Sequence, residues 1–157
     1  MNPIHPALAP LAPLAKRKDW RRLQPAMVRA LCEPAWLRPE HRVGDPTRYM
    51  RHVLYVDPDG DFVMTAITWL PGQVSPLHGH HVWCAFGVAE GELTEEQFLP
   101  DLSRLKTTVY RAGDMADQDL DCRIVHRVSN RGAKTLVSLH LYGVSAEKLT
   151  TGINRLF

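Results

Sequence analysis

Residues 71–91 read PGQVSPLHGHHVWCAFGVAEG, and two histidines in this stretch, His78 and His80, are separated by a single residue. On a β-strand, residues two apart point to the same face, so both imidazoles can aim at one point. Imidazole is a good ligand for divalent transition metals. A Pro-Gly turn precedes the pair, and an apolar run at 82–88 followed by a Glu-Gly turn is typical of a strand that ends in a hairpin. The stretch therefore predicts a metal-binding pair next to a β-hairpin.

A third histidine, His126, lies in another strand-like run, DCRIVHRVSN, at residues 121–130. The plain alternative for His-x-His is a pair of polar residues at a strand end, but the flanking residues form longer frames. These are Gly-x5-His-x-His-x3-Cys-x6-Gly, which begins at Gly72, and His-x3-Asn, which begins at His126. Together they resemble the two motifs of the cupin family of small β-barrels, which usually carry glutamate where this chain has Cys84. The resemblance implies three neutral histidine ligands without a carboxylate, a departure that the thiol dioxygenases share.

The length and composition are those of a single globular domain, with 157 residues of which 45% are hydrophobic. We expect residues 1–157 to form one cupin domain, with an extended and helical segment at 1–47, a β-barrel at 48–145 and a tail at 146–157. No apolar run is long enough to span a membrane. The apolar part near the N-terminus is broken by prolines and its positive charges follow it, which is unlike a signal peptide.

The cysteine content favours a cytoplasmic location, and the net charge says little about partners. The three cysteines are an odd number without metal-like spacing, which suits a reducing compartment. The net charge is +2, and the basic cluster at residues 16–22 is more typical of a solvated helix face than of a nucleic-acid site. We therefore expect no nucleic-acid or membrane partner, and a monomer or a weak homo-oligomer.

Hydrophobic periodicity divides the chain into a helical part and a β-rich part. Trp20, Leu23, Met27 and Leu31 recur at intervals of three and four, which predicts one or two short helices packed outside the barrel. The first 15 residues are expected to be extended or loosely docked, and residues 146–157 to form a short helix. Many short strands with regular turns indicate an all-β barrel or sandwich. Alternation and turn signals predict strands at 51–56, 62–69, 82–88, 92–98, 107–110, 123–128 and 135–142.

Three polar residues, Ser138, His140 and Tyr142, alternate along the last long predicted strand and therefore share one face. Burying polar groups is costly unless they pair with one another or serve chemistry. A single buried histidine or tyrosine is commonly a satisfied core residue. Three in alternation, beside a metal triad, favour a hydrogen-bonded row that orients the tyrosine and takes or gives its proton.

Arg51 and Cys84 are the other predicted interior groups. If the strand through His80 has no bulge, Cys84 faces the same way as the histidines. Arg51 is presented on one face of an early strand, and a buried guanidinium needs an anion such as a carboxylate, which fits its fork bidentately. No unpaired acid in the motif stretches is an obvious partner, so a substrate carboxylate is the natural candidate.

Residues 49–142 resemble the cysteine dioxygenase family and its bacterial relatives, including the 3-mercaptopropionate dioxygenases. The matching pieces are YMR at 49–51, WLPGQVSPLHGHHVW at 69–83, HRVSN at 126–130 and SLHLYG at 138–143. The resemblance implies a mononuclear non-haem Fe(II) held by His78, His80 and His126. It further implies a catalytic row of Ser138, His140 and Tyr142, a carboxylate-binding Arg51, and a thioether cross-link between Cys84 and Tyr142.

The implied reaction adds both atoms of the co-substrate O2 to the sulfur of a small thiol carboxylate and gives a sulfinic acid. Arg51 is typical of the cysteine-type members and favours L-cysteine, whereas WLPGQVSP and Gly143 are typical of the 3-mercaptopropionate enzymes. 3-Mercaptopropionate is therefore the alternative substrate. Two other classes stay open: a Zn²⁺- or Mn²⁺-dependent cupin isomerase or lyase, which would not need O2, and a ligand-binding cupin without catalysis.

The chain departs from the family pattern at Gly79, where members often have aspartate between the two histidines. His81 follows at once and points away from His80 on an ideal strand, so we expect it at the surface unless a bulge makes it a competing ligand. The chain is also shorter than most relatives near the C-terminus, which predicts a more open substrate end. Trp69 and Trp83 are expected mainly to pack the barrel.

Overall fold

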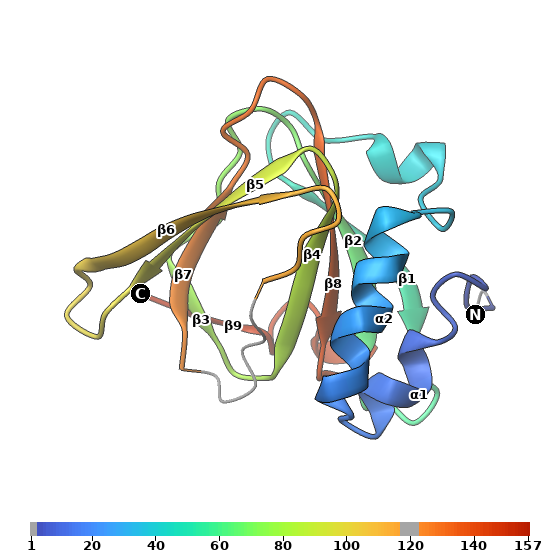
Figure 1. The fold of residues 1–157 in the computed structure, drawn as a ribbon. Helices are drawn as coiled ribbons and strands as arrows, with labels where there is room; N and C mark the ends of the chain where they lie inside the picture. Colours follow the sequence, from blue (N-terminus) through green and yellow to red (C-terminus); the bar gives the residue numbers. More distant parts are fainter. Residues whose placement is uncertain (1–2, 117–122) are drawn as a thin grey trace.

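The computed structural model describes residues 3–116 and 123–157, which form two antiparallel β-sheets that face each other (Figure 1). One sheet has the strand order β1-β2-β8-β4, and the other has the order β6-β5-β7-β3-β9. This is the predicted all-β cupin architecture. One of the three cysteines, Cys122, lies outside the described residues. The strands are β1 Met50–Val56, β2 Val63–Trp69, β3 His78–His80, β4 Cys84–Glu90, β5 Glu92–Phe98, β6 Arg104–Arg111, β7 Val125–Ser129, β8 Leu136–Tyr142 and β9 Asn154–Leu156.

The seven predicted strands are all present, with ends that differ from the prediction by at most three residues. The prediction of a helix at 146–157 is correct only for a single 3-10 turn, η2 (Ala146–Lys148), and wrong for the residues after it, which form β9. A strand of three residues has no alternation to detect. It exists because its backbone pairs with β3, far away in the sequence.

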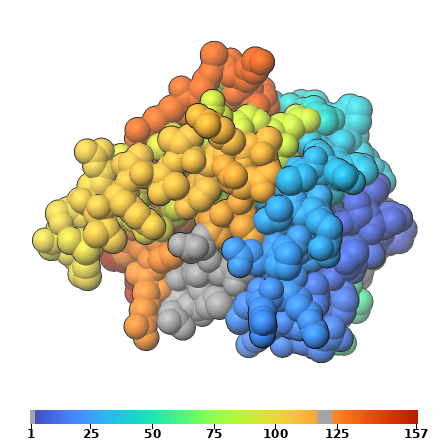
Figure 2. Space-filling model, viewed as in Figure 1, coloured from blue at the N-terminus to red at the C-terminus, as the bar shows by residue number. Residues whose placement is uncertain are grey.

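The segment before the barrel contains α1 (Leu11–Lys16), α2 (Trp20–Cys32) and the 3-10 turn η1 (Pro39–Arg42). Both helices lie against the outside of the four-stranded sheet (Figure 1), and these N-terminal residues cover one flank of the molecule in the space-filling view (Figure 2). The hairpin of β5 and β6 protrudes on the opposite flank. Within the described part of the chain, no helix has the length and apolar character needed to cross a membrane.

The expectation that residues 1–15 are extended or loosely docked is wrong. Leu8, Leu11 and Ala15 are fully buried, and the last two belong to α1. Pro10 lies at the N-cap and Pro13 in the first turn of this helix. Backbone N–H groups in a first turn have no intrahelical acceptor, so proline there removes no hydrogen bond.

The core consists of two clusters on the two faces of the four-stranded sheet. On the outer face, the predicted stripe Leu23, Met27 and Leu31 of α2 packs in one cluster with Leu139 and other outward residues of the sheet. On the inner face, the second cluster fills the space between the sheets. The alternation of β8 separates the two, because its outward leucines join the helices while its polar residues face the interior.

Gly143 is required by packing, which weakens its value as a clue to the substrate. A Cβ at this position would lie 2.1 Å from Nε1 of Trp83, closer than non-bonded atoms approach. Trp83 in turn packs edge-to-face on Trp20 of α2, with ring centroids 4.9 Å apart. Trp83 therefore packs the barrel against the helices, which agrees with its predicted packing role. It does not line the cavity between the sheets that is described below.

We expect Gly143→Ala to lower the free energy of unfolding by about 1–3 kcal/mol, the usual cost of overpacking a core, because the indole of Trp83 must move. Urea unfolding followed by tryptophan fluorescence measures this loss. Gly132→Ala is the matched control, since the nearest atom to its Cβ would be 3.4 Å away, an ordinary contact. Equal stability of the two variants would contradict this account of Gly143.

Candidate metal centre and its cavity

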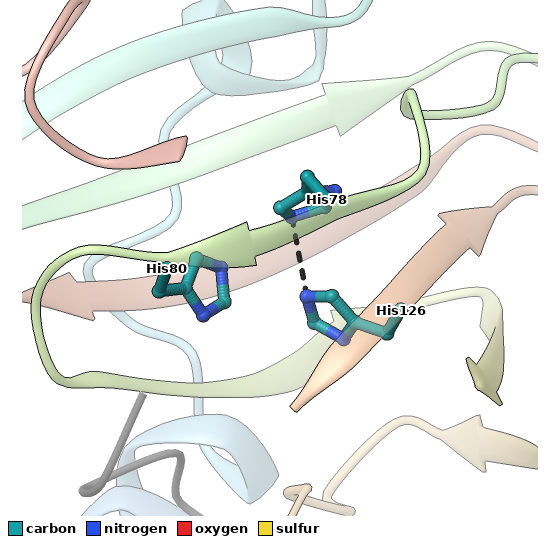
Figure 3. A group of neighbouring side chains, drawn as sticks. All are labelled: His78, His80 and His126. Carbon is teal, nitrogen blue, oxygen red and sulfur yellow. Dashed lines mark hydrogen bonds between the residues drawn. The ribbon is translucent and has the colours of Figure 1, made fainter. Parts of the chain in front are cut away.

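His78, His80 and His126 meet in the interior, as the sequence predicts (Figure 3). The first two belong to β3, and His126 belongs to the neighbouring β7, where it lies directly opposite His78 in the ladder. All three side chains are buried, and one ring nitrogen of each lies within 4.8 Å of the others. The three rings therefore surround one point at which a metal ion can be bound.

The hydrogen bonds of the two paired histidines fix which nitrogen faces that point. Nδ1 of His78 donates to the carbonyl oxygen of Pro76 at 2.8 Å, and Nδ1 of His126 lies 2.6 Å from a carboxylate oxygen of Glu95. In the neutral rings both Nε2 atoms are then unprotonated, and they lie 3.1 Å apart.

Two lone pairs at this distance repel each other unless a cation lies between them. Burial, together with the neighbouring His126, lowers the pKa of His78 to about 3, so a proton is a poor candidate for that cation near neutral pH. A divalent metal ion fits the donor set better, because neutral imidazole nitrogen is a preferred ligand of transition metals.

Glu95 is a candidate functional residue that the sequence reasoning missed. Its carboxylate is only 2% exposed, and it accepts hydrogen bonds from His126 and, at 2.9 Å, from the hydroxyl of Tyr110 on β6. Burial alone would raise the pKa of Glu95, but these hydrogen bonds lower it below its usual value. A metal-bound histidine commonly donates its second N–H to such a carboxylate, which fixes the ring and makes it a stronger ligand.

We expect Glu95→Gln to weaken metal binding about 10- to 100-fold, the usual effect of losing a hydrogen-bonded partner of a ligand, while the three histidines stay in place. Competition with a chromophoric chelator measures the affinity. Tyr110→Phe is the control, because it removes a hydrogen bond from Glu95 without touching His126. An unchanged affinity in Glu95→Gln would show that this carboxylate does not support the ligand.

A second group of side chains that could hold a metal already contains a cation of the protein itself. Asp57, Asp59 and Asp61 form the loop between β1 and β2, and the ammonium group of Lys16 lies among them. It is 3.3 Å from Asp57 and 3.8 Å from Asp61, and it also contacts Asp59. This cluster connects α1 to the barrel, and the histidines remain the candidate metal site.

The predicted row of Ser138, His140 and Tyr142 is hydrogen-bonded as expected and fully buried. Oγ of Ser138 lies 2.8 Å from Nε2 of His140, and Nδ1 of His140 lies 3.0 Å from the hydroxyl of Tyr142. Trp69 extends the row, because its Nε1 donates to Oγ of Ser138 at 3.1 Å. Its indole also lines the cavity, so Trp69 does more than pack the barrel.

Protonation states in this row follow from its burial. Burial, with a further contribution from nearby Arg51, lowers the pKa of His140 well below its usual value, so its imidazole is neutral. Burial also raises the pKa of Tyr142, so the phenol keeps its proton. A neutral imidazole between two hydroxyl groups can relay a hydrogen bond without carrying a charge, which suits a row that orients the phenol.

Arg51 reaches the cavity from β1. Its Nη1 donates to the carbonyl oxygen of Leu149 at 3.3 Å, and its Nε is buried without a hydrogen-bond partner in the described part of the chain. Its Cζ lies 5.7 Å from the centroid of the Tyr142 ring. A guanidinium with an unused buried donor beside the row is the arrangement expected of an anion-binding group.

Cys84 faces the same interior, although the chain reaches it differently from the predicted continuous strand. β3 ends at His80 and β4 begins at Cys84, and these strands belong to opposite sheets. The chain crosses between the sheets at residues 81–83, and both side chains line the cavity, each from its own sheet. Cys84 lies directly opposite Tyr142 in the ladder of β4 and β8.

The structure gives a packing reason for Gly79 and places His81 at the surface. A Cβ at Gly79 would lie 3.1 Å from Nη2 of Arg155 and 3.3 Å from the carbonyl oxygen of Ile124, so the guanidinium occupies the space beside the glycine. The side chain of His81 is exposed and does not line the cavity, as the alternation predicts.

Except for Ser138, the predicted site residues line one cavity between the sheets, with about 360 Å³ of empty space that includes its open end. Its apolar wall comes from Ile67, Phe86 and Val128, and no carboxylate is among the described residues that line it. The remaining lining residues are Tyr49, Arg51, Trp69, Ser75, His78, His80, Cys84, His126, His140, Tyr142 and Asn154.

Comparison with solved structures supports the cupin fold. An uncharacterized conserved protein with a double-stranded β-helix domain from Klebsiella pneumoniae has a TM-score of 0.55 and 22% identity, and the match covers 68% of this chain and 86% of that one. The protein TT1209 from Thermus thermophilus has a TM-score of 0.56 and 16% identity, covering 67% and 91%. A recombinant oxalate oxidase in complex with glycolate has a TM-score of 0.51 and 17% identity, covering 64% and 53%.

At the level of sequence, residues 35–149 match the model of the family described as cysteine dioxygenase type I. The matched residues include both histidine motifs, Arg51 and the row on β8. They span well over half of the chain, and the histidine triad they contain has the geometry of a metal site. The chain is therefore a metal-dependent cupin that belongs to the cysteine dioxygenase type I family.

Proposed function

We propose that the protein is an Fe(II)-dependent thiol dioxygenase that uses O2 to convert a small thiol carboxylate to its sulfinic acid, with L-cysteine as the favoured substrate. The observation that carries the proposal is the combination of three histidine donors with a half-buried guanidinium, whose Nε is buried and unused, in one cavity. Ligands without charge leave the positive charge of a metal available to a thiolate. The guanidinium offers a place for a carboxylate on the same small molecule.

In this proposal His78, His80 and His126 hold the iron, and the chemistry supplied by bound Fe(II) is the activation of O2 beside a thiolate. Arg51 binds the substrate carboxylate and thereby fixes the position of the sulfur. Tyr142 keeps its phenolic proton and offers it as a hydrogen bond toward the reacting atoms.

The other residues of the cavity orient these groups and exclude water. His140 and Ser138 hold the phenol of Tyr142 in one orientation. Ile67, Phe86 and Val128 line the cavity with apolar surface, which keeps the site dry and strengthens the electrostatic contact with Arg51. The proposed partner is a small-molecule thiol, acting without nucleic acid or membrane.

The deciding experiment is O2 consumption by the Fe(II)-loaded protein with L-cysteine and with 3-mercaptopropionate in separate runs. The expected result is uptake with L-cysteine and a product heavier by two oxygen atoms, identified by mass spectrometry. Uptake with 3-mercaptopropionate alone would keep the class and change the substrate. No uptake with either thiol at full iron occupancy would overturn the proposal.

The proposed cross-link between Cys84 and Tyr142 follows from the same family membership and from their opposite positions in the β4–β8 ladder. The thioether replaces one S–H and one ring C–H bond by a C–S bond, and the two electrons and two protons pass to O2. We expect iron-loaded protein exposed to O2 and thiol to show a faster-migrating gel band and an intact mass lower by two hydrogen atoms. Cys84→Ser should abolish both signals, and a single unchanged band in the wild type would exclude the link.

A further inference from the structure

One residue that lines the cavity, Asn154, belongs to β9, which lies beyond the residues matched by the family. β9 pairs antiparallel with β3, and Asn154 lies directly opposite His80. Residues that are opposite in an antiparallel pair point to the same face of the sheet. The side chain of Asn154 is therefore on the same face as the metal-binding histidines, and it is one of the residues that line the cavity.

The register of β9 is held on both sides of Asn154. The backbone N–H of His81 donates to Ile153 at 2.8 Å, and that of Phe157 donates to Leu77 at 3.3 Å. On the outer face, the guanidinium of Arg155 fills the space beside Gly79, as described above. The short C-terminal part was expected to leave the substrate end of the cavity more open. Asn154 of β9 lines this end, so it is less open than that expectation implies.

Asn154 marks the mouth of the cavity together with Tyr49 and Arg51. These three residues line both the cavity and a depression on the surface, whose other walls are Arg48, Met50 and Thr150. A carboxylate bound by Arg51 is therefore held near the mouth, and the substituent on the carbon next to that carboxylate lies at the same end of the cavity.

The amide of Asn154 is available to a ligand. It is half-buried, and it makes no side-chain hydrogen bond to another residue in the described ranges. Because no carboxylate lines the cavity among these residues, a substrate N–H group finds no anionic acceptor there. The amide oxygen of Asn154 is a neutral acceptor positioned at the mouth.

We propose that Asn154 determines substrate specificity by accepting a hydrogen bond from the α-amino group of the thiol substrate, so that the site prefers an α-amino thiol acid to a thiol acid without an amine. The inference rests on the proposed function for the identity of the ligand class. It adds a residue outside the matched family region, and it is tested by binding rather than by turnover.

The test uses Co(II)-substituted protein under anaerobic conditions, where binding of a thiolate to the metal is followed by its charge-transfer absorption. L-Cysteine and 3-mercaptopropionate are titrated into the wild type, Asn154→Ala and Asn154→Asp. We expect Asn154→Ala to raise the Kd for L-cysteine about tenfold, the usual effect of losing one hydrogen bond of this kind, and to leave the Kd for 3-mercaptopropionate unchanged. Asn154→Asp keeps the acceptor oxygen but adds a negative charge near the carboxylate of both thiols, so the readout is the ratio of the two Kd values, which should still favour L-cysteine.

The outcomes separate this inference from the proposed function. Equal weakening of both thiols by Asn154→Ala would mean that the amide donates to the carboxylate and would overturn the inference, as would an unchanged Kd for L-cysteine. Thr150→Ala is the matched control, since Thr150 lines the outer depression and is not among the residues that line the cavity. Selective binding without O2 uptake by the iron protein would overturn the proposed function and leave the role of Asn154 intact.

Discussion

His126→Ala is expected to remove most of the bound metal, and this should be the largest effect of any single substitution at the site. His126 supplies one of three ligand nitrogens, from a different strand than the other two, so its loss leaves only the pair on β3. The affinity should fall by more than the roughly 10- to 100-fold expected when only the hydrogen-bonded partner of a ligand is lost. Metal content after anaerobic loading and desalting, measured by elemental analysis, checks the prediction.

His81→Ala is the matched control for this experiment, because His81 follows His80 directly but is exposed and outside the cavity. It should retain a full complement of metal. A His126 variant that still binds metal as the wild type does would show that the triad is not the metal site. A loss of metal in both variants would indicate that His81 also takes part in holding the ion.

Arg51→Ala is expected to raise the KM for L-cysteine about 100-fold, because a desolvated charged pair typically contributes about 2–5 kcal/mol to binding when one partner is removed. The metal content should stay unchanged, since Arg51 contacts none of the histidines in a hydrogen bond. The KM for cysteamine, an aminothiol without a carboxylate, should be the same in the variant and in the wild type. Steady-state O2 uptake with both thiols measures the difference.

Arg48→Ala is the control for charge at the mouth. The side chain of Arg48 is 76% exposed and lies in the outer depression, so its removal should change KM little. If Arg51→Ala also loses its metal, the role of Arg51 is structural. If cysteamine is affected as strongly as L-cysteine, the guanidinium does not bind the carboxylate.

The strands and the pair His78 and His80 could be predicted because their signals are local. A strand of seven residues such as β8 shows its two faces in its own sequence, with Val137, Leu139 and Leu141 on one face and Ser138, His140 and Tyr142 on the other. The same alternation placed His78 and His80 together. His126 was assigned to the same site because its motif resembles the second motif of the family. The pairing of β3 with β7, in which His126 lies opposite His78, agrees with that assignment.

The parts that escaped prediction depend on which strands become neighbours. Glu95 is on the inward face of β5, and it meets His126 only because β5 pairs with β7. Its inward position could have been predicted, because it is two residues from the buried Leu93 on the same strand. The neighbouring sequence does not indicate that its hydrogen-bond partner is His126. Asn154 is a stronger case, because a three-residue strand carries no pattern and its place is set by β3.

The crossing between His80 and Cys84 escaped for a related reason. Alternation alone predicts one continuous face, whereas the chain leaves one sheet and enters the other within three residues. The prediction that both side chains share the interior is correct because the two sheets face the same cavity. The N-terminal helix α1 was missed because prolines in a helix's first turn resemble prolines that prevent a helix.

The position of β3 has a consequence for biosynthesis. Its three residues are flanked by β7 and β9, both of which are translated long after the two histidines have been added to the growing polypeptide. During that interval the pair has neither its third ligand nor its neighbouring strands, and closing such long loops is entropically costly and slow. Metal incorporation is therefore expected to be a late step, which follows rather than nucleates the collapse of the barrel.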